Sequence, residues 1–100
     1  SSRPRLAVFV RASPIALQVL PEVLGDGAHD AIAQAGPPGR DGWRTLSLVF
    51  ESKEAATHRL LGFGDLVEVV SPEEVRQQLV GTARAALRRY QPDQPAGGAV

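Results

Sequence analysis

Strand-like and helix-like segments follow one another along this chain in an order that only a few small folds accommodate. Apolar residues run unbroken through Leu6–Val10, so both faces of this segment are apolar, which predicts a central strand. Within Trp43–Glu51 a leucine or phenylalanine recurs at every second position from Leu46 onwards, which predicts a strand with one buried face. A shorter apolar run, Leu66–Val70, predicts a further strand.

Two helices are predicted between these strands. Ser13 followed by Pro14 is typical of a helix N-terminus, where the serine caps free backbone N–H groups and the proline needs none. This helix should end or kink just before Pro21, which lacks the donor for the next turn. Ser52 is the predicted N-cap of the second helix, over Lys53–Leu61.

Glycine and proline mark the remaining helix boundaries. Gly62 and Gly64 are expected to end the second helix in left-handed geometry. The run Ser71-Pro72-Glu73-Glu74 has the pattern of a capping box with Ser71 as N-cap, and it predicts a last helix that ends at about Tyr90. The apolar stripe of that helix is predicted to comprise Val75, Leu79, Ala83, Ala86 and Tyr90.

The segment His29–Ala35 is interpreted as a weak strand because it stands directly before a turn. Residues 36–42 form this turn, which is dense in Gly and Pro, and a clear strand comes next, so the two strands predict a hairpin. The resulting order is β-α-β-β-α-β-α. It predicts an α+β fold, a ferredoxin-like βαββαβ four-stranded antiparallel sheet with an added C-terminal helix. We expect one domain over residues 1–90, a flexible tail over 91–100, and a core centred on Leu48, Phe50, Leu60 and Phe63.

Composition excludes several classes of function. Eleven basic residues balance eleven acidic ones, so the chain lacks the positive field that drives binding to a phosphate backbone. Without cysteine there is no disulfide, thiolate metal site or thiol nucleophile, which fits a reducing cytoplasm. Apolar runs are far shorter than the roughly 18 residues that span a bilayer. We therefore expect a cytoplasmic protein with no membrane partner and no cofactor.

The residues that could carry chemistry do not combine into an active site. Glu54 and His58 share a helix face and could hold a metal, but no third ligand is evident, so a surface pair is the simpler interpretation. His29 and Asp30 would point to opposite faces of a strand. Gly62-x-Gly64 follows a helix and precedes a strand, the reverse of a phosphate-binding loop. No nucleophile, base and oxyanion donor converge, so we expect no enzyme activity and assign neither catalytic nor metal-binding residues.

Three sequence blocks are distinctive: D-G-W-R-T-L-S-L-V-F-E (41–51), L-L-G-F-G-D-L-V-E-V-V-S-P-E-E-V-R (60–76) and A-L-R-R-Y (86–90). Through these blocks the sequence from Gly42 to Tyr90 resembles the C-terminal extension (WCX) domain of bacterial WYL-type transcriptional regulators, a group that includes the proteasome accessory factor B and C proteins. The middle block is the most specific. Residues 1–41 agree with the family only in pattern.

The resemblance implies a regulatory domain that dimerises or contacts a WYL domain. It would relay the binding of an effector, a small molecule or a nucleic acid, to an N-terminal winged helix-turn-helix. DNA binding would belong to that module, which lies outside these 100 residues. The alternative is a stand-alone ACT-like module that binds small molecules. Arginines of the last helix are the candidate ligand-binding or partner-binding residues: Arg76, Arg84 and Arg88.

Each arginine also has a purely structural interpretation. Arg76 could pair with Glu73, or it could face a ligand or the neighbouring WYL domain. Arg84, Arg88 and Arg89 cluster near the helix C-terminus, where positive charge complements the helix dipole. The same cluster could instead bind a phosphate or an acidic partner.

Overall fold

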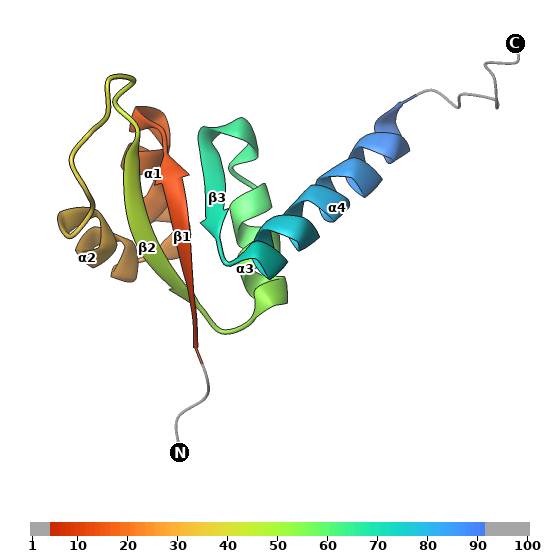
Figure 1. The fold of residues 1–100 in the computed structure, drawn as a ribbon, viewed down its shortest axis with the longest axis horizontal. Helices are drawn as coiled ribbons and strands as arrows, with labels where there is room; N and C mark the ends of the chain where they lie inside the picture. Colours follow the sequence, from red (N-terminus) through yellow and green to blue (C-terminus); the bar gives the residue numbers. More distant parts are fainter. Residues whose placement is uncertain (1–4, 92–100) are drawn as a thin grey trace, which may run out of the picture.

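β1 (Leu6–Ala12) is the central strand of a three-stranded antiparallel sheet in the computed structural model, which describes residues 5–91. β2 (Arg44–Phe50) pairs with it on one side and β3 (Val67–Ser71) on the other, so the order is β2-β1-β3 (Figure 1). The three strands predicted from the apolar runs are thus confirmed to within a residue or two.

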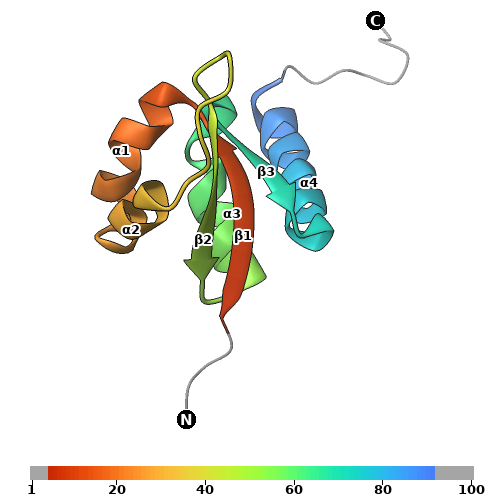
Figure 2. The ribbon, with the colours of Figure 1, turned by 60° about the vertical axis from the view of Figure 1, so that its left-hand side comes forward.

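One face of the sheet carries the core. Val8, Val10, Leu48 and Val69 point toward α1 (Pro14–Leu24) and α3 (Lys53–Leu61) and are buried. The four residues predicted at the centre of the core are all buried: Leu48, Phe50, Leu60 and Phe63. On the opposite face the apolar side chains stay partly exposed: Phe9, Val49 and Val70. Figure 2 shows α1 and α2 together on one side of the sheet.

The predicted strand His29–Ala35 is wrong, because α2 (Gly27–Ala33) occupies most of this segment. Alanine has the highest helix propensity, and this alanine-rich segment has a single β-branched residue, Ile32. Only traces of the predicted hairpin remain: the Gly36 amide donates to the Thr45 carbonyl at 2.9 Å, beside β2. The sheet over residues 5–91 therefore has three strands rather than the four of the ferredoxin-like plan.

Serine caps start α1 and α3 as predicted. The Ser13 Oγ accepts a hydrogen bond from the Ala16 amide at 3.1 Å, and the Ser52 Oγ accepts one from the Ala55 amide at 3.0 Å. Of the two outcomes predicted at Pro21, the end of the helix is wrong, since α1 continues through Pro21 to Leu24. Packing of the last turn against the core offsets the lost hydrogen bond, because Leu24 is partly buried there.

The other two helix boundaries differ from the prediction. Gly64 has the left-handed φ of +61° that was predicted, but Gly62 has a right-handed φ of −63°. The predicted capping box is not formed: Pro72 stands at the N-cap position of α4 (Glu73–Tyr90), without a side-chain cap. Ser71 is still paired with Phe9 at the end of β3, so its hydroxyl is not placed to cap the helix.

Helix α4 projects away from the rest of the domain, as Figure 1 shows. Among the residues described, no helix is both long and apolar enough to cross a membrane. Of the tail predicted at residues 91–100, all but Gln91 lies outside the described residues.

Candidate interaction surface on helix α4

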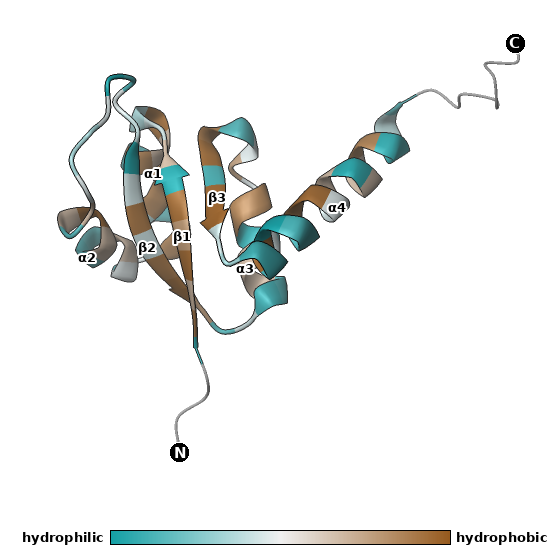
Figure 3. Ribbon diagram, in the orientation of Figure 1, coloured by the Kyte–Doolittle hydropathy of each residue, from teal (hydrophilic) through white to brown (hydrophobic). Residues whose placement is uncertain are grey.

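The projecting part of α4 exposes large apolar side chains. Val75, near its start, is the one buried residue of this helix. Further along, Val80 is 39% exposed, Leu87 55% and Tyr90 87%. Apolar segments continue along α4 well beyond the sheet in Figure 3. Burial of such side chains elsewhere would be favourable, since each Å² of apolar surface removed from water contributes roughly 25 cal/mol.

The exposed apolar residues belong to a row with heptad-like spacing, in which only Ala83 is half-buried. The positions alternate by four and three residues and lie along one helix face: Arg76, Val80, Ala83, Leu87 and Tyr90. The stripe predicted from the sequence lies along one helix face, but it is buried only at its start. Its first members, Val75 and Leu79, pack on or against the core, whereas Ala86 and Tyr90 are exposed. The reason is that the domain reaches only the first turns of α4.

A shallow groove of about 390 Å³ runs between β3 and the base of this exposed face. Leu79 and Val80 of α4 form one wall together with Arg76. Trp43 lines the other side, and two acidic residues, Asp65 and Glu68, lie on its border with solvent. The exposed face of α4 therefore continues into a groove of mixed apolar and acidic character.

Charge is divided between the two ends of α4. The first turn carries Glu73 and Glu74, and the last turn carries Arg88 and Arg89. Both placements complement the helix dipole, and of the predicted arginine cluster only Arg88 and Arg89 lie in the last turn. Arg84 and Arg88 are exposed and lie beyond the part of α4 that packs on the domain.

Arg76 does not form the pair with Glu73 that the sequence allowed. The Glu73 carboxylate instead accepts a hydrogen bond from the side-chain amide of Gln77 at 2.6 Å. Within residues 5–91, Arg76 has no ion pair, and its side chain lines the groove. The structure thus places Arg76 at the groove and Arg84 and Arg88 on the projecting part of α4, and it does not bring the three together.

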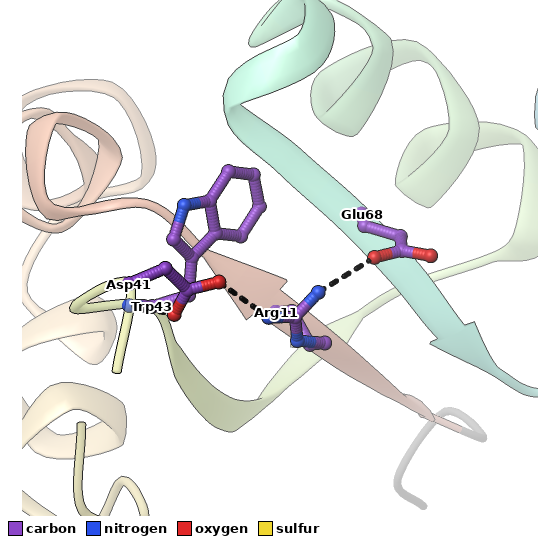
Figure 4. Close-up of polar contacts among 4 residues, drawn as sticks. All are labelled: Arg11, Asp41, Trp43 and Glu68. Carbon is purple, nitrogen blue, oxygen red and sulfur yellow. Dashed lines mark hydrogen bonds and ion pairs between the residues drawn. The ribbon is translucent and has the colours of Figure 1, made fainter. Parts of the chain in front are cut away.

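Arg11 organises a polar cluster that sequence reasoning missed (Figure 4). Its guanidinium donates to Asp41 and to Glu68, each at 3.1 Å, and lies 5.2 Å from the centre of the Trp43 ring. The Trp43 amide donates to Asp41 and, with the nearby Arg11 charge, lowers the pKa of that carboxyl. The cluster ties the loop before β2 to β1 and β3. The cluster depends on the pairing of Arg11 with Glu68 across β1 and β3, which the sequence alone does not show.

The remaining chemical candidates lie exposed on two helices. Glu54 and His58 are exposed on α3, and His29 and Asp30 are exposed on α2 instead of a strand. Over the described part of the chain, no three His, Cys, Asp or Glu residues gather in a way that could hold a metal ion. Gly62 and Gly64 only shape the turn between α3 and β3.

Comparison with known proteins identifies the family of this chain. No curated protein matches the chain. The model of one family, described as the WCX domain, matches residues 3–87. The match spans β1 through most of α4, including the groove and most of the heptad-spaced face. With most of its length covered by this one model, the chain belongs to the WCX domain family.

Proposed function

We propose that this WCX domain is the C-terminal regulatory domain of a WYL-type transcriptional regulator, and that it acts by self-association. In this proposal it joins two copies of the regulator and relays effector binding in the neighbouring WYL domain to the DNA-binding modules. The observation that carries the proposal is the projecting α4, whose large apolar side chains Val80, Leu87 and Tyr90 stay exposed.

Exposed apolar residues that occur singly are ordinary, whereas an aligned row on one helix is typical of an interaction surface. The row on α4 is accompanied by a tyrosine and by arginines, residue types that are enriched at protein interfaces. A two-fold assembly also suits a bacterial DNA-binding regulator, because dimers bind two half-sites at once.

DNA itself is not the proposed partner of this domain. The formal charge is zero, and the arginines of α4 are matched by acidic residues at its base and in the groove. In an electrophoretic shift assay at physiological salt, the chain should leave duplex DNA unshifted. A shift that depends on DNA sequence would contradict this part of the proposal.

Sedimentation velocity of the 100-residue chain tests self-association directly. Its mass is 10.6 kDa, and the weight-average mass should rise toward twice that value as concentration increases through the micromolar range. A chain that stays monomeric up to its solubility limit would overturn the proposal.

The relay is tested in the full-length regulator. Removal of this domain should weaken operator binding and abolish its response to the effector, because the two half-site modules are no longer held together. An unchanged effector response would show that the signal does not pass through this domain.

A further inference from the structure

We infer that α4 pairs antiparallel with α4 of a second copy, so that the tip of each helix lies in the groove at the base of the other. This inference rests on the proposed self-association and specifies its geometry. The heptad-spaced face is the basis, because the four-three spacing keeps the same stripe toward a partner helix along its whole length. In the isolated domain, no described segment covers the outer part of this stripe.

The spacing fixes a register. In an antiparallel pair the alternating positions of one helix face those of the other in reverse order. Val80 then faces Ala83 of the second copy, and Arg76 faces Leu87 of the second copy. Leu87 and Tyr90 of the second copy therefore reach the groove lined by Arg76, Leu79 and Val80. The Arg76 guanidinium lies within reach of the Tyr90 ring, a pairing that cations and aromatic faces favour.

Charge selects the antiparallel direction and a second copy as the occupant. The acidic first turn of one α4, Glu73 and Glu74, comes near the basic last turn of the other, Arg88 and Arg89. Asp65, on the border of the groove, adds to this attraction, whereas Glu68 is already paired with Arg11. A parallel pair would place like charges side by side and align the two helix dipoles unfavourably. The chain thus carries both halves of a complementary interface on one helix.

A matched pair of charge substitutions tests the surface. Leu87→Glu places a carboxylate within the pairing face, and Ala85→Glu places the same group on the outer face of the helix, where the side chain is exposed. Because Leu87 is exposed in the single domain, folding should be unaffected in both variants. In sedimentation equilibrium, Leu87→Glu should raise the dimer dissociation constant by about tenfold or more, and Ala85→Glu should leave it near that of the unaltered chain.

Sedimentation equilibrium also distinguishes pairing through α4 from self-association through another surface. Val49→Glu alters the exposed face of the sheet, the competing route to a dimer. If Val49→Glu disrupts the dimer and Leu87→Glu does not, the pairing through α4 is wrong while self-association stands. If the unaltered chain forms no dimer at all, both fail together.

The absence of cysteine allows a direct test of the register. Under oxidising conditions, a mixture of Val80→Cys and Ala83→Cys chains should form mainly the mixed disulfide, because these positions face each other only in the antiparallel register. A parallel pair would instead place each cysteine beside the same position of the second chain. Faster formation of the Val80→Cys homodimer than of the mixed disulfide would overturn the antiparallel arrangement.

Discussion

Leu48 of β2 lies directly opposite Val8 of β1, and both side chains are buried between the sheet and the helices. Leu60 of α3 is buried in the same core. Truncation of Leu48 or Leu60 to alanine should therefore cost ~2–5 kcal/mol of unfolding free energy, the usual range for a large buried aliphatic side chain. Urea denaturation measures this loss. Arg84→Ala, at an exposed position, is the control and should cost under ~0.5 kcal/mol.

The Arg11 cluster predicts a loss of stability in acid. The pKa of Asp41 in the folded chain is below its ordinary value of 3.8, chiefly because the Trp43 amide donates to the carboxylate. A carboxyl whose folded pKa is depressed stabilises the fold above its unfolded pKa, and this contribution is lost as the pH falls through the folded pKa. Below about pH 4, the melting temperature of the unaltered chain should therefore fall more steeply than that of Asp41→Asn.

Asp30→Asn provides the comparison for that experiment. It removes an exposed carboxylate that has no side-chain hydrogen bond or ion pair within residues 5–91. Its acid dependence should follow that of the unaltered chain. Equal slopes for Asp41→Asn and the unaltered chain would show that the Asp41 contacts contribute nothing measurable.

Two serines are predicted from the sequence as helix caps, but their substitution by alanine should destabilise the domain to different extents. Ser52→Ala removes the hydroxyl that accepts from the Ala55 amide at the start of α3, which should cost ~0.5–2 kcal/mol. Ser71→Ala should cost less than ~0.5 kcal/mol, because Ser71 ends β3 and caps no helix. Thermal denaturation of both variants measures the difference. A larger loss for Ser71→Ala would mean that the capping box forms after all.

The two glycines after α3 provide a second contrast. Gly64 adopts a φ of +61°, so Gly64→Ala should destabilise the domain by ~1–2 kcal/mol through backbone strain. Gly62 has a helical φ, and a Cβ there would meet the Arg59 carbonyl at 3.4 Å, an ordinary contact. Gly62→Ala should therefore be nearly neutral. Urea midpoints of the two variants decide whether only the first position requires glycine.

The sequence predicts elements well where a local pattern decides them. The alternation in β2, the serine caps of α1 and α3, and the long α4 all depend on neighbouring residues. The segment His29–Ala35 shows the limit: the turn after it suggested a hairpin, but the helix propensity of its alanines prevailed. A conflict between two local signals cannot be settled without the packing around them.

The candidate surface was predicted only in part, for a geometric reason. The sequence identifies α4 and its arginines, but the face that the domain buries depends on how far the helix extends beyond the sheet. Val75 and Tyr90 both belong to the predicted stripe, yet one is buried and the other is exposed. The pairing of Arg11 with Glu68 joins residues 57 positions apart, which no local pattern reveals.

The central position of β1 has a consequence for synthesis of the chain. Of the three strands, β1 leaves the ribosome first and is the one that both others pair with, and β3 is made only after β2 and α3. Until then the apolar segment Leu6–Val10 has no complete sheet to join. Contacts so distant in sequence form late. A chain released before Val67 would leave Phe9–Ala12, the part of β1 that pairs with β3, without a partner on that edge, so protection of the nascent domain from aggregation depends on β3.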